Sequence, residues 1–244
     1  MLRHVQHCNV NCRDLTRSVA FYRDELGLTP LVRTAPAPQD GTGFGISGPV
    51  QWDAWMMSDG RPHPVIDLLE WTQPAPTGRP HEAPDAIGMT ALRLGSPMVE
   101  APTEVTDPDG TRLVLEPADR VTLLGVIVNV GDVAAATDWY RRVLGLAPTA
   151  TGLVVPGDDF EIRLRPGASD RRPYERATDL GIFRMAFLVD DATAAVESIR
   201  ADGHPCPDPV WLDMGPTIPI DGLRAAFFRD PAGTCLEYIE APTG

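Results

Sequence analysis

The side chains that could carry chemistry in this 244-residue chain are limited first by residue type. All 21 basic residues are arginine, so Schiff-base chemistry and lysine-bound pyridoxal phosphate are excluded. Cys8 and Cys12 would lie about 13 Å apart on an extended strand, at ~3.3 Å per residue, which is too far to share a metal ion. With Cys206 and Cys235 they are expected to be small thiols that fill the core. Asp67 lies in the apolar segment VIDLLEW, where an unpaired carboxylate is costly, so it needs a partner unless it faces water at a strand edge.

The composition of the chain indicates a globular, β-rich protein with a small-molecule partner. The net charge of −13 disfavours a nucleic-acid partner. No run of 18 apolar residues and no signal-peptide pattern is present, so we expect a cytoplasmic protein that does not bind a membrane. The 25 prolines and 22 glycines indicate short elements joined by turns. We expect neither a nucleotide cofactor nor pyridoxal phosphate.

An internal repeat sets the elements that must position any site. The segment HCNVNCRDLTRSVAFYRDELGLTP, residues 7–30, aligns without a gap on GVIVNVGDVAAATDWYRRVLGLAP, residues 125–148, at an offset of 118. Each copy predicts a strand, a helix capped by Asp14 in the first copy, and a stop at Gly27. QWDAWMMS and PVIDLLEW then predict further strands, so the unit is βαβββ.

A second, looser repeat divides the chain into four modules. AIGMTALRL, from Ala86, aligns with GIFRMAFLV, from Gly181, at an offset of 95, and DPDGTRLVLE, from Asp107, aligns with DPAGTCLEYI, from Asp230, at an offset of 123. The second module is therefore shorter by 28 residues and lacks the helix predicted for DATAAVESIRADG. Pro-rich connectors separate the modules within each half. The predicted halves are residues 1–119 and 120–244.

The opening HCNVNCRDLTRSVAFYRDELGL and the closing DPAGTCLEYIE resemble the signatures of the vicinal-oxygen-chelate superfamily of glyoxalases, bleomycin-resistance proteins and extradiol dioxygenases. The resemblance covers essentially the whole chain. It implies an α+β fold of four βαβββ-type modules, in which two modules form one β-lined cup. Ligand positions in this family lie on the first and last strands of each module. The first-strand positions are His7, Met89, Gly125 and Arg184, and the last-strand positions are Asp67, Val114, Arg163 and Glu237.

Two pairings of the modules remain open. If adjacent modules share a cup, as in the extradiol dioxygenases, neither cup has a credible metal cage. If the modules exchange, as in the glyoxalases, modules one and four bring together His7, Asp67, Arg184 and Glu237. Modules two and three then give Met89, Val114, Gly125 and Arg163, so we expect one polar cup and one blank cup. We prefer the exchanged pairing because it collects the polar ligand positions in one place.

The resemblance implies a divalent metal ion (Fe, Mn, Zn or Ni) on His7, Asp67 and Glu237, with Arg184 and Glu237 in catalytic roles. Arg184 cannot ligate a cation, so it neutralises a carboxylate or binds the substrate. The other expected substrate-binding residues are Trp52, Trp55 and Arg163. The ordinary alternatives are a structural histidine and an Arg184–Glu237 ion pair.

Two functional classes follow from the resemblance. One is a metal-dependent lyase, isomerase or dioxygenase acting on a substrate with vicinal oxygens. The other is a metal-free protein that sequesters an antibiotic or metabolite, as bleomycin-resistance proteins do. Fold alone does not choose between them. We expect a small-molecule ligand and a monomer or homodimer.

Overall fold

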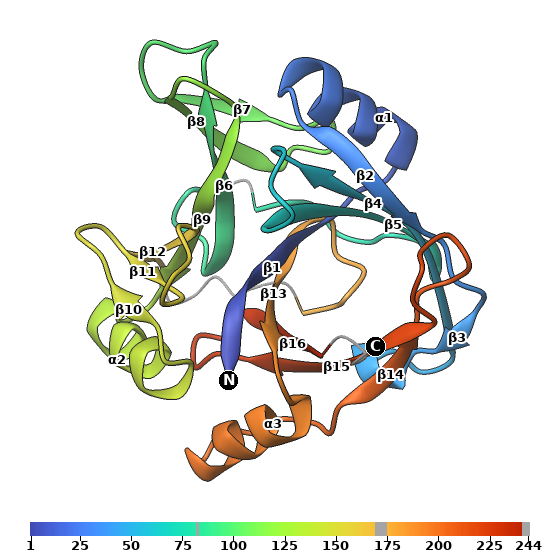
Figure 1. The fold of residues 1–244 in the computed structure, drawn as a ribbon. Helices are drawn as coiled ribbons and strands as arrows, with labels where there is room; N and C mark the ends of the chain where they lie inside the picture. Colours follow the sequence, from blue (N-terminus) through green and yellow to red (C-terminus); the bar gives the residue numbers. More distant parts are fainter. Residues whose placement is uncertain (82, 169–174, 241–244) are drawn as a thin grey trace.

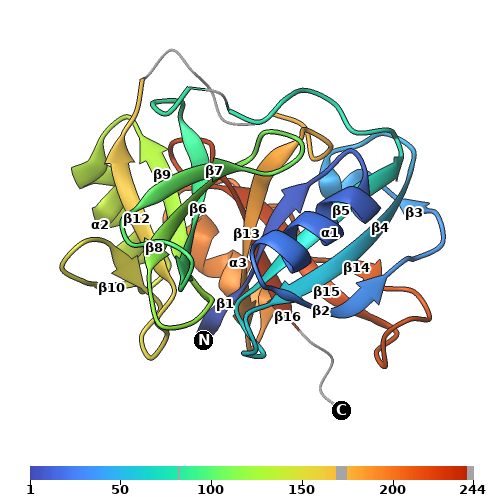
Figure 2. The same ribbon diagram turned by 90° about the horizontal axis from the view of Figure 1, so that it is seen from above.

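A computed structural model describes residues 1–81, 83–168 and 175–240. In these ranges the chain forms two curled β-sheets with helices on the outside of the molecule (Figures 1 and 2). The first sheet has the order β14–β15–β16–β13–β1–β5–β4–β2, with β3 paired to β4, and the second has the order β10–β11–β12–β9–β6–β8–β7. This arrangement confirms the predicted α+β fold with β-lined cups.

The first sheet uses strands from the two ends of the chain, and the second uses strands from its middle. The first sheet contains β1 (Leu2–Asn11), β2 (Thr29–Thr34), β3 (Gln39–Asp40), β4 (Pro49–Ser58), β5 (Val65–Gln73), β13 (Gly181–Val189), β14 (Val210–Asp213), β15 (Gly222–Arg229) and β16 (Cys235–Glu240). The second contains β6 (Gly88–Ser96), β7 (Thr103–Thr106), β8 (Arg112–Pro117), β9 (Thr122–Val130), β10 (Ala147–Pro148), β11 (Leu153–Val154) and β12 (Glu161–Pro166). The first sheet therefore has the exchanged pairing.

Each α-helix is preceded by an aspartate that caps its first turn. They are α1 (Leu15–Ala20), which continues as a π-helical turn over Phe21–Glu25, α2 (Val133–Val143) and α3 (Ala192–Ala201). Asp14, Asp132 and Asp191 each accept a hydrogen bond from the amide three residues later, at 3.0, 3.0 and 2.9 Å. Gly27 and Gly145 follow α1 and α2 with φ of 77° and 71°, a conformation that favours glycine.

The predicted alignment of module two is wrong by two residues. Asn11 pairs with Gly181, and its equivalent Asn129 pairs with Gly88, so the offset is 93 and the shorter copy lacks 30 residues. Met89 is therefore not the ligand position of this module; Ala91 is. A shift of two residues keeps every strand side chain on the same face, so hydrophobic alternation could not detect it. The missing helix is confirmed, because residues 97–102 form a turn where the fourth module has α3.

Two buried clusters of hydrophobic side chains lie on opposite faces of the first sheet. The larger includes Val10 and Leu68 of the first sheet and Val128 of the second, so it lies between the sheets. The smaller includes Trp52 and Leu69 and fills the inside of the curled first sheet. We call this inner space the first cup, and the corresponding space inside the second sheet the second cup. No helix of the described residues is long and apolar enough to cross a membrane.

A buried tyrosine links the two modules in each half of the chain. Tyr22 donates a hydrogen bond to Asp107 at 3.2 Å, and Tyr140 donates one to Asp230 at 2.9 Å. The backbone amide of Thr234 donates to the other carboxylate oxygen of Asp230 at 2.7 Å, which holds its turn. Burial raises the pKa of both aspartates, although hydrogen bonds from Thr111 to Asp107 and from Thr234 to Asp230 stabilise their charged forms.

We expect Tyr140→Phe to lower the free energy of unfolding by about 2 kcal/mol, because a buried carboxylate loses a donor. Urea unfolding followed by circular dichroism measures the change. Tyr22→Phe is the matched variant and should have a similar but smaller effect, because its hydrogen bond is longer. Equal stability of the wild type and both variants would contradict this role.

Candidate functional site

Four neighbouring strands of the first sheet bring together the polar residues expected from the exchanged pairing. Their order is β5–β1–β13–β16, and they carry Asp67, His7, Arg184 and Glu237 respectively. Ala186 pairs with His7 on one side and with Glu237 on the other. Because alanine has a small side chain, the imidazole and the carboxylate can approach each other across the strand between them. All four polar side chains are buried.

Arg184 lies between the two carboxylates. Its Nε donates to Glu237 Oε2 at 2.8 Å, and its Nη2 donates to Asp67 Oδ2 at 3.2 Å. His7 Nε2 lies 3.4 Å from the same Glu237 oxygen and 3.9 Å from the same Asp67 oxygen. Asn9 also donates to Asp67 Oδ2, at 3.2 Å. The guanidinium thus binds the two carboxylate oxygens that face the histidine.

The electrostatics of this cluster favour a charged Glu237. Burial by itself raises its pKa, but the charge of Arg184, the nearby His7 and the hydrogen bond from Arg184 outweigh burial, so the pKa of Glu237 is lowered. Burial likewise lowers the pKa of Arg184, and the charges of Glu237 and Asp67 raise it above its ordinary value. Arg184 therefore faces two acidic side chains with its single positive charge.

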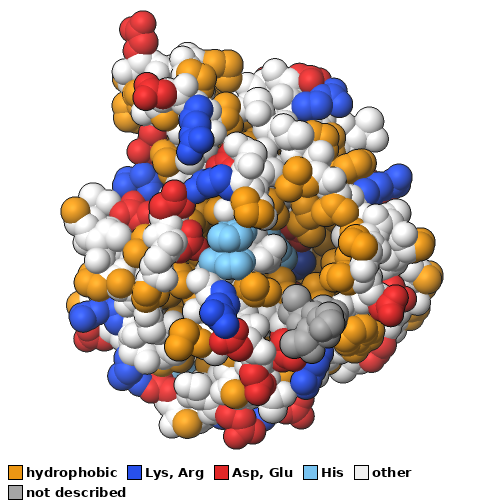
Figure 3. Space-filling view, viewed as in Figure 1, with side chains coloured by type: hydrophobic (Ala, Val, Ile, Leu, Met, Phe, Trp, Pro, Cys, Tyr) orange, Lys and Arg blue, Asp and Glu red, His pale blue; other side chains and the backbone are white. Residues whose placement is uncertain are grey.

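The cluster faces a cavity of about 30 Å³ inside the first cup. Hydrophobic side chains cover it, among them Phe44, Trp52 and Leu212. Three buried polar atoms of the cluster have no hydrogen-bond partner: His7 Nε2, Asp67 Oδ1 and Arg184 Nη1. Buried polar groups are normally paired, so these atoms indicate a place for a polar ligand group. A space-filling view of one face of the molecule shows hydrophobic side chains around a central hollow (Figure 3).

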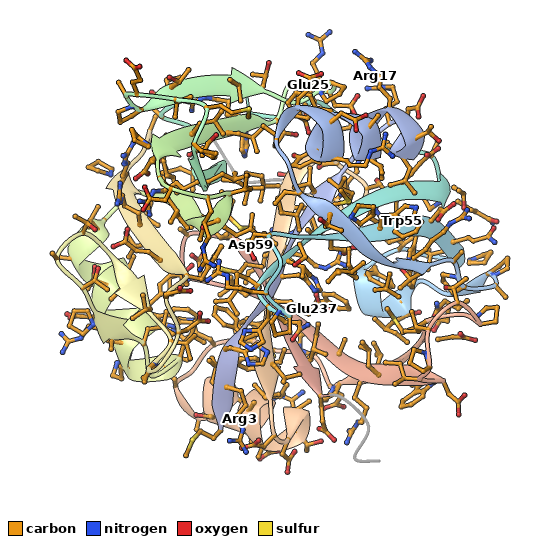
Figure 4. All side chains as sticks on the ribbon, turned by 45° about the horizontal axis from the view of Figure 1, so that its top comes forward. Arg3, Arg17, Glu25, Trp55, Asp59 and Glu237 are labelled. Carbon is orange, nitrogen blue, oxygen red and sulfur yellow. The ribbon has the colours of Figure 1, made fainter. Side chains whose placement is uncertain are left out.

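Trp52 and Trp55, both expected to bind substrate, lie on opposite faces of β4. Trp52 lines the cavity and donates to Thr34 Oγ1 at 3.3 Å. Trp55 packs against the core between the sheets, and it lies away from Glu237, which is near the centre of the molecule (Figure 4). Residues three apart on a strand face opposite sides, so the two tryptophans could not both line the cup.

Arg163 lies in the second cup, where the structure also shows charged residues that the sequence prediction missed. Arg93 donates to Glu116 at 2.6 Å and to Glu161 at 2.7 Å, and Arg163 donates to Glu161 at 2.8 Å. The expectation of a cup without polar character is therefore wrong. The signal was available in the segment ALRLG, where Arg93 interrupts an apolar strand as Asp67 does in VIDLLEW.

The donor set of the first cup does not fit a resident divalent ion in this arrangement. An ion bound by His7, Asp67 and Glu237 would need the carboxylate oxygens that Arg184 already binds, beside a fixed positive charge. The distances from His7 Nε2 to these two oxygens, 3.4 and 3.9 Å, are ones that ligands about 2.0–2.2 Å from a shared ion can have, so it is the guanidinium, and not the spacing of the donors, that opposes an ion here. Among the described residues, no group of three His, Cys, Asp or Glu side chains is arranged to hold a metal ion.

Comparison with known protein families agrees with this fold. The model of the glyoxalase/bleomycin resistance protein/dioxygenase superfamily matches residues 4–115 and 118–238. The chain belongs to this superfamily. A search of curated protein sequences found no significant match.

Solved structures of this superfamily share the fold of the whole chain. Glyoxalase I from Zea mays is 15% identical with a TM-score of 0.66, and the match covers 97% of this chain and 92% of that one. A proposed dioxygenase from Bacillus subtilis is 13% identical with a TM-score of 0.65, and the match covers 100% of this chain and 86% of that one. At these identities the likeness concerns the fold alone.

Proposed function

We propose that this superfamily member binds a small organic molecule in its first cup without a resident metal ion, as a sequestering or metal-independent protein. The observation that carries the proposal is the placement of Arg184 on both Asp67 and Glu237. The guanidinium supplies the positive charge that a metal ion would supply in this place. It also leaves Nη1 free to donate a hydrogen bond to a ligand.

The unpaired atoms of the cluster favour a neutral polar group on the ligand. Arg184 Nη1 is a donor, Asp67 Oδ1 is an acceptor, and His7 Nε2 is either, depending on its tautomer. A hydroxyl or amide group offers both a donor and an acceptor. Arg184 is already paired with two acidic side chains, which disfavours a carboxylate or phosphate on the ligand, because a further negative charge in this buried site is costly. Arg184 would therefore bind a neutral group rather than an anion.

A metal-dependent lyase, isomerase or dioxygenase is the second candidate function. The convergence of His7, Asp67 and Glu237 on one cavity favours it, because proteins of this superfamily commonly use divalent metal ions. In this candidate Arg184 would have to release the carboxylates before an ion could bind. The two candidates therefore differ in whether the folded protein holds a metal ion.

Metal analysis separates the two candidates. Protein purified without chelator, then loaded in turn with iron, manganese, zinc and nickel and desalted, should retain far less than one ion per chain by mass spectrometry. The reason is that Arg184 occupies the oxygens that the ion would need. Retention of about one ion per chain, lost in His7→Ala with the fold preserved by circular dichroism, would replace the proposal with the metalloenzyme.

A further inference from the structure

Phe44 lies between the polar cavity and a second, larger pocket. The larger pocket has a volume of about 580 Å³, and its lining includes Phe44, Ile46, Phe183 and Phe227. Phe44 also lines the 30 Å³ cavity of the polar cluster. The guanidinium carbon of Arg184 lies 5.7 Å from the centroid of the Phe227 ring, so the cluster and the larger pocket meet at that ring too.

The polar cavity is too small for an organic molecule, since 30 Å³ is about the share of one water molecule in the liquid. The larger pocket, by contrast, is within the usual range of ligand sites, about 300–1,000 Å³. An organic molecule that uses the unpaired atoms of the cluster must therefore occupy the larger pocket and reach past Phe44.

Ring contacts hold Phe44 in this position. Its ring lies 4.8 Å from that of Phe227, 5.3 Å from Trp71 and 5.6 Å from Trp52, measured between centroids. Phe44 ends the short helical turn Thr42–Phe44, between β3 and β4, and its side chain is only partly buried. The contacts are thus hydrophobic ones that another aromatic ring could replace without leaving a polar group unpaired.

From these observations we infer that Phe44 is a gate, and that the ligand is a planar aromatic molecule with a hydroxyl or amide at one edge. The ring of the ligand takes the place of Phe44 against Phe227 and the tryptophans, and its polar edge reaches Arg184 Nη1 and His7 Nε2. The inference rests on the proposed function, because it assigns the cluster to a ligand. An aliphatic molecule would not stack on the aromatic walls of the pocket. An anionic molecule would be repelled by the two acidic side chains of the cluster.

Stopped-flow tryptophan fluorescence with 2-naphthol and naphthalene as probes tests the inference, because Trp52 and Trp71 lie beside Phe44. In the wild type, 2-naphthol should bind about tenfold more tightly than naphthalene, because only its hydroxyl can pair with the cluster. Phe44→Ala should raise the association rate of both probes about tenfold, because the ring contacts no longer have to break. Phe21→Ala is the matched control, since Phe21 is also partly buried but packs against the other core.

The outcomes distinguish the gate from the proposed function. Arg184→Met, or His7→Gln if the former does not fold, should remove the preference for 2-naphthol and leave the effect of Phe44→Ala intact. Equal association rates in the wild type and Phe44→Ala, or equal acceleration by Phe21→Ala, would overturn the gate. A preference for 2-naphthol that survives both cluster variants would overturn the proposed use of the cluster instead.

Discussion

Arg184→His is expected to give a protein that retains about one divalent metal ion per chain, which we do not expect of the wild type. The change removes the guanidinium from Asp67 Oδ2 and Glu237 Oε2 and adds an imidazole at the first-strand ligand position of the fourth module. His7, Asp67 and Glu237 already face the same cavity, so four donors would surround one point. The largest gain is expected for zinc or nickel, because both ions accept mixed imidazole and carboxylate ligands.

Mass spectrometry of the loaded protein and thermal unfolding with and without metal measure the gain. When free metal is at a hundred times its dissociation constant, the free energy of unfolding should rise by about 2.7 kcal/mol. Arg184→Met is the matched control, since it removes the guanidinium without adding a donor. Without metal it should be less stable than the wild type by about 3–5 kcal/mol, because two buried carboxylates lose their partner. If the wild type binds metal as tightly as Arg184→His, Arg184 does not block the site.

Glu161→Gln is expected to remove a large part of the acid sensitivity of the fold. Burial raises the pKa of Glu161, but hydrogen bonds from Thr151, Thr149 and Arg163 outweigh it and lower the pKa to about 2 from an ordinary value of 4.5. A lowered folded-state pKa contributes stability above the unfolded-state value, and that stability is lost as the pH falls from 4.5 towards 2. The contribution at neutral pH is about 3 kcal/mol.

Urea unfolding at pH 7 and at pH 3 tests this assignment. The wild type should lose more stability between the two pH values than Glu161→Gln does, because glutamine cannot be protonated in this range. At pH 7 the variant should be the less stable of the two, since Arg93 and Arg163 lose their shared carboxylate. The matched control is Glu104→Gln, which removes an exposed partner of Arg112 and should cost under about 1 kcal/mol. Parallel pH profiles for the wild type and Glu161→Gln would contradict the assignment.

Much of the fold was predictable because the repeat carries strong local signals. Asp14 and Gly27 mark the two ends of the first helical segment, and their equivalents mark the ends of α2. The bounds of these helices could therefore be predicted from an N-capping side chain and from a glycine that adopts a positive φ. The exchanged pairing was predictable for a different reason. Charged residues on apolar strands need partners, and only one pairing brings Asp67 and Glu237 to Arg184.

The remaining features depend on register and side-chain geometry, which a sequence pattern does not contain. Met89 was misaligned with Arg184 because strand alternation is unchanged by a shift of two. Trp55 was placed in the cup although its distance of three from Trp52 puts it on the other face of β4. Whether Arg184 binds the carboxylates or a ligand depends on distances of a few ångströms, and only coordinates supply these.

Along the sequence, the strands of the second sheet lie between the two groups of strands that form the first sheet. This order has a consequence during synthesis on the ribosome. β1 lies between β5, which ends at Gln73, and β13, which begins at Gly181. At about 5–20 residues per second, β13 is made roughly 5–20 s after β5. Throughout that delay one edge of β1 has no partner strand, and an unpaired apolar edge is a template for association with other chains. The strands β6–β12 can complete the second sheet while β1–β5 still lack their partner strands β13–β16.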